Sequence, residues 1–114
     1  MIIVYVKHYL NENGMKFFDG QWFPDVERLI RNQPGYILIE SHRDPHICDC
    51  INITVKFTDQ KTLDAWVATP EHIGVINQLE SYRIRPWNYA VTENELARLD
   101  SLEWGEVPIQ HGTI

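Results

Sequence analysis

Residues 57–87, FTDQKTLDAWVATPEHIGVINQLESYRIRPW, decide the fold. A strand is predicted to end at Phe57, and Asp59 is predicted to cap the helix that follows. Thr69 is a good cap for a second helical segment, and Pro70 is tolerated in the first turn of a helix. The end of the stretch is aromatic and rich in arginine, which is typical of a strand. The stretch therefore predicts a broken helix that returns into a strand.

The residues before this stretch supply the other half of the fold. Apolar residues alternate along 2–10 and recur at helical spacing along 15–32, where Pro24 predicts a kink or a fresh helical start. Two runs rich in β-branched and aromatic residues, 36–42 and 47–57, predict a hairpin. The resulting order, β-α-β-β-α-β, is the ferredoxin-like α+β pattern: an antiparallel sheet with helices on one face.

Local patterns within these elements lead to further expectations. Asn11 and Gly14 belong to a run of turn residues that is predicted to end the first strand. Ile73, Ile76 and Leu79 are predicted to form the buried stripe of the second helical segment.

The sheet face that carries no helices is predicted to be apolar. We expect Ile37 and Ile39 on one strand, and Ile51, Ile53 and Val55 on the next, to lie on this face. Such a face is too apolar for water, so a second copy packed on it is favoured, giving a C2 dimer. A monomer covered by its own tail is the alternative.

The domain is predicted to end near residue 91, and residues 92–114 form an acidic extension. The extension holds five acidic residues and one base, Arg98, whereas the rest of the chain is near balance. It is predicted to form a short amphipathic helix that packs on the domain or on a partner subunit, through Glu95, Leu96, Leu99, Leu102 and Trp104.

Composition excludes several classes of function. With 114 residues and 44% hydrophobic content, the chain is expected to form one domain with a real core. A net charge of −6 argues against nucleic-acid binding. The sequence has no run of 18 apolar residues, so no membrane span is predicted. No secretory signal is expected either. Two cysteines without an export signal predict the cytoplasm.

The decisive stretch resembles the antibiotic biosynthesis monooxygenase-like family of the dimeric α+β barrel superfamily. The resemblance covers about residues 1–91 in element order, and it rests on loose motifs at Phe57, Asp59, Trp66, Thr69-Pro70 and His72. It implies a homodimer with a pocket between helices and sheet that binds flat organic molecules. Members of the family oxygenate polycyclic phenols or anthrones without metal or flavin, oxidise quinols, or cleave haem, and others have no known substrate.

The haem-cleaving branch can be tested against this sequence. The resemblance implies an asparagine on the first strand and an iron-binding histidine ten positions after a helical tryptophan. Trp66 fits this pattern, but Ile76 stands ten positions later and the first strand offers His8. The departure argues against haem degradation of the usual kind, and haem bound through a nonstandard histidine stays an alternative.

Two residues of the decisive stretch are candidates for the active site. His72 falls in the first helical turn, where the helix dipole favours a neutral imidazole that can act as a general base. A surface or capping histidine is the alternative. Trp66 is predicted to form a wall of an aromatic pocket, and packing in the core with Leu63 and Val67 is the alternative.

Three further residues are candidates for substrate binding. His8 ends an apolar strand face near the expected pocket, although a structural histidine is common in such a place. Asn52 lies in mid-strand, where a buried amide needs a partner such as a substrate oxygen. Arg83 points the same way as Arg85, so the pair could bind a carboxylate; ion pairing with acidic side chains across the dimer, such as those of the acidic tail, is the favoured reading.

No metal and no cofactor are predicted. His42, His46, Cys48 and Cys50 invite a zinc reading, but Cys-x-Cys on a strand lacks the turn that usually brings two thiolates to one ion. Free thiols are the favoured reading.

The resemblance, taken with these candidate residues, implies a cofactor-independent monooxygenase for a planar phenolic, quinol or polyketide-like aromatic. The alternatives are a non-catalytic small-molecule-binding or stress-associated dimer, and a haem-binding protein with a nonstandard ligand.

Overall fold

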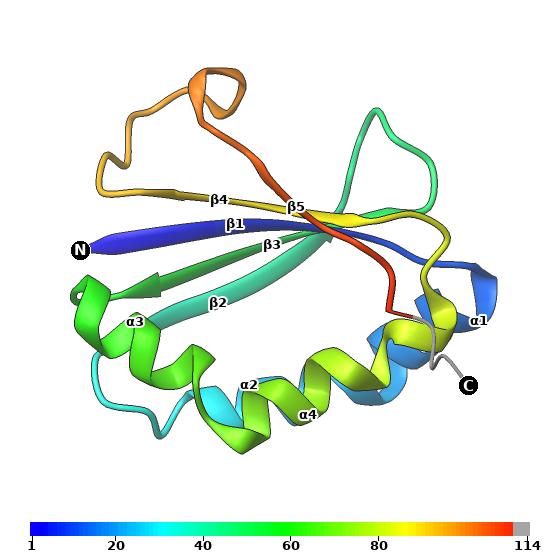
Figure 1. Ribbon diagram of the computed structural model, residues 1–114, viewed down its shortest axis with the longest axis horizontal. Helices are drawn as coiled ribbons and strands as arrows, with labels where there is room; N and C mark the ends of the chain where they lie inside the picture. The colour runs from blue at the N-terminus through cyan, green and yellow to red at the C-terminus, as the bar shows by residue number, and fades with distance from the viewer. Residues whose placement is uncertain (111–114) are drawn as a thin grey trace.

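One layer of helices covers one face of a five-stranded antiparallel sheet in the computed structural model, which describes residues 1–110 (Figure 1). The strands lie in the order β2-β3-β1-β4-β5. Their bounds are Ile2–Tyr9 for β1, Tyr36–Arg43 for β2, Cys50–Phe57 for β3, Trp87–Thr92 for β4 and Gly105–Val107 for β5. The predicted ferredoxin-like α+β fold is confirmed, with one strand more than expected.

The helical layer comes from two stretches of the chain. The first contains α1, a π-helical turn η1 and α2, and the second contains α3, α4 and a 3-10 turn η2. Their bounds are Glu12–Phe17, Phe18–Trp22, Phe23–Ile30, Gln60–Val67, Pro70–Gln78 and Glu80–Tyr82. Pro24 lies in the first turn of α2, directly after the π turn, and the backbone is helical on both sides, so the irregularity expected at this proline is a π turn within a continuous helix.

Helix boundaries follow the predicted caps in the second half of the chain. The Asp59 carboxylate accepts a hydrogen bond from the Thr62 amide at 2.8 Å and starts α3. The Thr69 hydroxyl accepts one from the His72 amide at 3.1 Å, and Pro70 is the first residue of α4. Side-chain oxygens of this kind satisfy amides that the first helical turn leaves unpaired.

Helix α1 starts earlier than predicted. Asn11 was expected in a turn, but its side chain accepts a hydrogen bond from the Gly14 amide at 2.8 Å and caps a helix instead. Gly14 is needed for packing rather than for a turn, because a Cβ at this position would lie 2.6 Å from the Cβ of Tyr82.

The strand register decides which sheet face meets the helices, and it overturns the expected facing of β2 and β3. Ile39, Ile51, Ile53 and Val55 lie in the core beneath the helices instead of on the open face. Val4 and Val6 of β1 pair with Val55 and Ile53 of β3, and all four pack in the same core, so helices of the same subunit cover this face. Of the five predicted residues, Ile37 is surface-exposed at 46%, next to the register irregularity of β2.

Helix α4 buries a different stripe from the predicted one. Ile73 is 52% exposed, whereas Val75 and Leu79 are buried and Ile76 is partly buried. The helix therefore turns the side that carries Val75 and Leu79 towards the sheet.

The C-terminal extension forms a 3-10 turn and a strand in place of the expected amphipathic helix. The turn, η3, spans Leu99–Ser101, and β5 pairs antiparallel with β4 through Trp87↔Val107 and Tyr89↔Gly105. Residues 93–104 lie on the sheet face opposite the helices, above the sheet in Figure 1. Leu99 and Trp104 line a small depression there, so the chain covers part of its own open face.

Within residues 1–110, no helix is long and apolar enough to cross a membrane.

Candidate functional site

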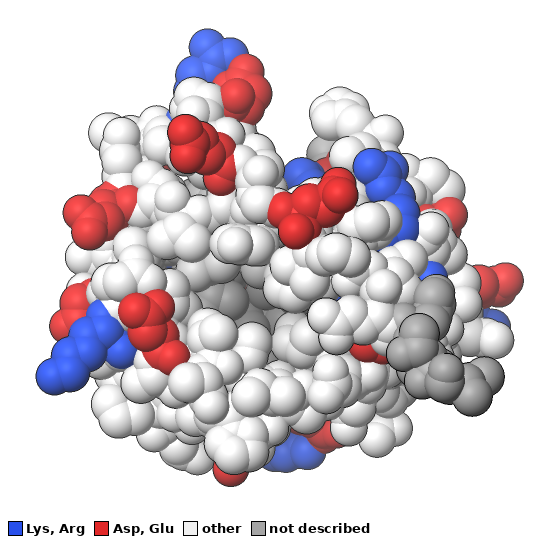
Figure 2. All heavy atoms as spheres, viewed as in Figure 1, with Lys and Arg blue, Asp and Glu red and all other residues white. Residues whose placement is uncertain are grey.

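A cavity of about 410 Å³ lies between the helical layer and the sheet. Figure 2 shows a hollow in the middle of the face, bordered mostly by uncharged side chains, and Gln60 and Asp64 are polar residues of the cavity lining. Valines, isoleucines and a leucine from both layers form most of its wall. The residues with aromatic or imidazole rings are His8, Trp22, Trp66, His72, Trp87 and Tyr89. An apolar cavity of this size with a few polar groups is typical of a small-molecule site.

Trp22 is held in the cavity wall by a long-range hydrogen bond. Its indole N–H donates to the Val75 carbonyl oxygen at 2.6 Å, so it ties the π turn η1 to helix α4. The Trp22 ring stacks on Phe18 with ring centres 5.0 Å apart. A buried indole N–H needs a partner, and this one is satisfied within the protein.

Trp66 and His72 meet at the joint between α3 and α4. The Thr69 hydroxyl donates to the Trp66 carbonyl oxygen at 2.7 Å and accepts from the His72 amide at 3.1 Å. The two rings contact edge to face, with centres 5.3 Å apart and planes at 72°. One threonine side chain thus joins the backbones of two residues that line the cavity.

His72 is half-buried, and its environment favours the neutral imidazole. Burial lowers the pKa of His72 below its usual value, and an interaction with the Val67 backbone raises it and offsets part of the effect. A neutral imidazole has one nitrogen that accepts a proton. His72 can therefore act as a base towards a ligand in the cavity.

His8 is 1% exposed and is held by a buried chain of charges. Arg83 Nη1 lies 2.9 Å from His8 Nδ1, and Arg83 Nε donates to Glu80 Oε1 at 2.8 Å. Burial lowers the pKa of His8 well below its usual value, and the positive charge of Arg83 and the nearby His72 lower it further. His8 is therefore neutral at physiological pH.

The His8 ring lies between two tryptophans. Its centre is 5.2 Å from the ring centre of Trp87 and 5.9 Å from that of Trp22. Arg83 also lies over the Trp87 ring at 5.4 Å. In the part of the chain that the structure describes, the buried Trp87 Nε1 and Arg83 Nη2 have no hydrogen-bond partner.

The structure brings together three of the five predicted site residues. His72, Trp66 and His8 line the same cavity. Arg83 lies behind His8 with its side chain fully buried. It forms an ion pair with Glu80, three residues earlier in the chain. Glu80 belongs to the same subunit, so this pair differs from the expected ion pair across a dimer.

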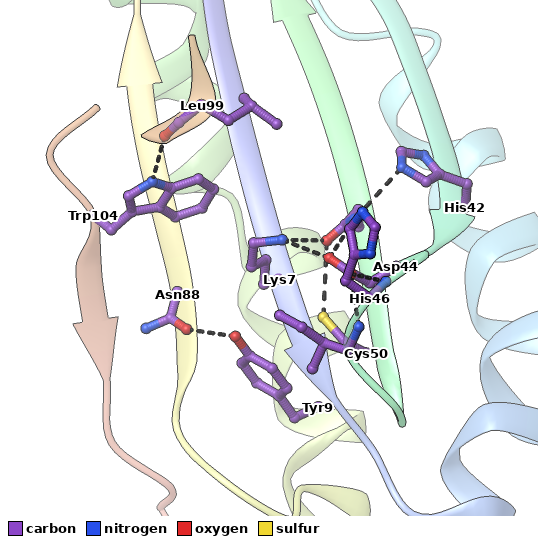
Figure 3. Close-up of polar contacts among 11 residues, drawn as sticks. Lys7, Tyr9, His42, Asp44, His46, Cys50, Asn88, Leu99 and Trp104 are labelled. Atoms are coloured by element: carbon purple, nitrogen blue, oxygen red, sulfur yellow. Dashed lines mark hydrogen bonds and ion pairs between the residues drawn. The ribbon is translucent and has the colours of Figure 1, made fainter. Parts of the chain in front are cut away.

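Asn52 lies on the opposite sheet face, outside the cavity. Its amide bonds Lys7 at 2.9 Å and Asp44 at 3.0 Å, and Lys7 pairs with Asp44 at 2.8 Å. Figure 3 shows Lys7 and Asp44 gathered here with His42 close by. The hydrogen bond from Lys7 is the main cause that lowers the pKa of Asp44, with help from Asn52. The Asn52 amide thus finds its partner in an ion pair that holds the β2–β3 loop on the sheet.

Two other sequence features are separate from the cavity. Arg85 lies over the Tyr9 ring at 4.1 Å, so it does not act together with Arg83. Over residues 1–110, no group of three or more His, Cys, Asp or Glu side chains is placed to hold a metal ion.

Sequence reasoning missed the part of the site contributed by β4 and η1. Trp87, Tyr89 and Val91 alternate along β4, which lies beside β1 in the sheet, and they line the cavity. This alternation of large side chains is a usable signal in the sequence. Trp22 recurs at helical spacing, and this pattern alone does not distinguish a cavity wall from a closed core.

The fold and the site define a small α+β protein with an aromatic-walled cavity between its two layers. Residues 1–77 match the profile of the antibiotic biosynthesis monooxygenase family, so the chain belongs to that family. No curated protein matches the chain significantly.

Solved structures share the fold at low sequence identity. A Deinococcus radiodurans protein provisionally called an antibiotic biosynthesis monooxygenase is 15% identical, with a TM-score of 0.74 over 86% of this chain and 96% of that one. SnoaB, a cofactor-independent oxygenase from Streptomyces nogalater, is 11% identical, with a TM-score of 0.70 over 86% and 96%. A conserved protein from Methanosarcina mazei Go1 is 12% identical, with a TM-score of 0.72 over 82% and 92%.

Proposed function

We propose that this protein is a cofactor-independent monooxygenase for a planar phenolic, quinol or polyketide-like aromatic bound in the cavity. The observation that carries the proposal is that two neutral histidines, His72 and His8, line one apolar cavity with three tryptophans. Membership of the monooxygenase family supports it, as does the shared fold with SnoaB, which is a cofactor-independent oxygenase.

In the proposed reaction, His72 removes a proton from a phenol or from an acidic C–H of the bound ring. The anion is the electron donor, and O2 is both the oxidant and the oxygen source. For an anthrone-type CH2 group, one oxygen atom becomes the new carbonyl and the other leaves as water with the two hydrogens. Trp66, Trp22 and Trp87 would hold the ring flat, and His8 would donate a hydrogen bond to its oxygen.

Oxygen uptake with anthrone, measured in the presence of a chelator, tests this proposal. The wild type is expected to show saturable uptake, and His72→Ala is expected to lose roughly 100-fold or more in rate, the usual contribution of a general base. Ile73→Ala is the matched control, because Ile73 is the next residue of the same helix and is exposed. Equal rates in His72→Ala and Ile73→Ala would remove His72 from the mechanism.

The same ligands decide between this proposal and its alternatives. Saturable quenching of tryptophan fluorescence by anthrone or a naphthoquinol without oxygen uptake would indicate the non-catalytic binding protein. A Soret band that appears on titration with hemin and is lost in His72→Ala would favour haem binding through a nonstandard histidine.

The proposal includes a homodimer and a cytoplasmic location. The open sheet face and the extension that lies on it are the proposed contact surface, where Leu96 is 90% exposed and Leu99 is 48% exposed. Light scattering of the full chain is expected to give twice the 13.4 kDa subunit mass, and Leu96→Asp is expected to shift it towards the monomer. A wild type that elutes at the subunit mass would contradict the dimer.

A further inference from the structure

The two ring nitrogens of His8 have different surroundings. Nδ1 is turned towards Arg83 Nη1 at 2.9 Å, behind the cavity wall. His8 is one of the residues that line the cavity, and its ring lies between those of Trp22 and Trp87. Nε2 is therefore the ring nitrogen that is left for a bound ligand.

The contact with Arg83 decides which nitrogen carries the proton. An arginine guanidinium only donates hydrogen bonds, so Nδ1 must accept and cannot carry a hydrogen. In the neutral ring the hydrogen is then on Nε2. Protonation of both nitrogens would turn an N–H of His8 against an N–H of Arg83, which opposes the imidazolium form.

Arg83 is itself held in place from behind. Its side chain is fully buried and pairs with Glu80, whose other oxygen accepts a hydrogen bond from the Gln110 amide at 2.9 Å. The charged group that faces His8 is therefore Arg83, and Glu80 lies beyond it. The other titratable group near His8 is His72, which lines the cavity from α4. This arrangement leaves the guanidinium little freedom to release Nδ1.

We propose that Arg83 is a positioning residue that fixes the His8 proton on Nε2, and that His8 Nε2–H and the Trp87 indole N–H form a two-donor site for one oxygen of a planar ligand. Trp87 is the second donor because its Nε1 is buried without a partner in residues 1–110, in a side chain that lines the cavity next to His8. A buried donor of this kind calls for an acceptor.

Two donors select a class of substrate. An aromatic ketone or a phenolate offers an oxygen with two lone pairs, whereas a ring without oxygen leaves both donors unpaired. Leaving buried polar groups unpaired is what makes such sites selective. This inference deepens the proposed monooxygenase and rests on it only for the identity of the substrate.

Nitrogen-15 NMR of histidine-labelled protein at about pH 7 tests the tautomer directly. The wild type is expected to show His8 only as the Nε2–H form. Arg83→Met is expected to show a mixture of both neutral forms, and Glu80→Gln, which keeps the guanidinium, is expected to stay close to the wild type. Nδ1–H or imidazolium at His8 in the wild type would overturn the proposal, and this holds even if Arg83→Met does not fold.

Binding under nitrogen tests the two-donor site without turnover. Anthrone and 9,10-dihydroanthracene have the same three-ring frame, and the second lacks the ketone oxygen. We expect the wild type to bind anthrone about 3- to 10-fold more tightly than dihydroanthracene, and Trp87→Phe to lose a large part of this preference. Equal affinities in the wild type would overturn the proposal. Neither experiment measures turnover, so a correct tautomer and preference without oxygen uptake would refute the oxygenase alone.

Discussion

Replacing Thr69 by alanine is expected to lower the free energy of unfolding by about 1.5–2.5 kcal/mol. The hydroxyl caps α4 through the His72 amide, and loss of such a cap costs about 1 kcal/mol. It also donates to the Trp66 carbonyl at 2.7 Å, and one such bond contributes about 0.5–1.5 kcal/mol. With about 2.1 cal/mol/K of unfolding entropy per residue over 114 residues, the expected fall in Tm is about 6–10 °C.

Thermal and urea unfolding followed by circular dichroism measure this change, with Thr69→Ser as the matched control. Serine keeps both hydrogen bonds of the hydroxyl, so it is expected to unfold within a degree or two of the wild type, or about 0.5 kcal/mol. Anthrone binding is expected to weaken in Thr69→Ala, because Trp66 and His72 are no longer joined. An alanine variant as stable as the serine variant would refute the reasoning that this hydroxyl holds the joint.

Three further predictions concern stability. Trp22→Phe leaves the buried Val75 carbonyl without its donor and is expected to cost about 1–3 kcal/mol in urea unfolding. Gly35→Ala is expected to cost at least about 1 kcal/mol and to lower Tm, because φ is +81° and the new Cβ would overlap the side chain of Thr62 in α3. In the folded protein the pKa values of His8 and His72 lie below the ordinary value of about 6.5. Their contribution to the free energy of unfolding is therefore fully present above about pH 6.5 and is lost as the pH falls below it. Urea unfolding between pH 8 and 5 is expected to show this loss, and His8→Gln is expected to reduce its slope.

The sequence was sufficient where structure depends on near neighbours. Asp59 and Thr69 each bond an amide three residues later, so their caps can be recognised from a few letters. The broken helix and the place of His72 at its restart follow from the same local rule. Asn11 obeys that rule too, and it was misread because asparagine is also common in turns.

The rest depends on contacts that are distant in sequence. Alternation along β3 separates two faces, but it does not say which face meets the helices, and Ile51 and Ile53 were assigned to the wrong one. His8 and Arg83 are 75 positions apart in the sequence. They meet because the chain just after β1 pairs with the segment before β4, through a bridge between Leu10 and Arg83. The pairing of β5 with β4 has the same origin, so an acidic, leucine-containing tail was read as a helix.

The pairing of β5 makes the two edges of the sheet unequal. Strand edges offer unpaired amides and carbonyls to other chains, and proteins protect them with very short edge strands or with charges. On one side the three residues of β5 form such a short edge, and on the other β2 presents eight residues that include Glu40 and Arg43. The longer β2 edge offers more unpaired groups for strand addition by another chain, next to exposed Ile37, and Glu40 and Arg43 are the charges that oppose it. A charge introduced at Ile37 would protect the protein during concentration or storage without reaching the cavity.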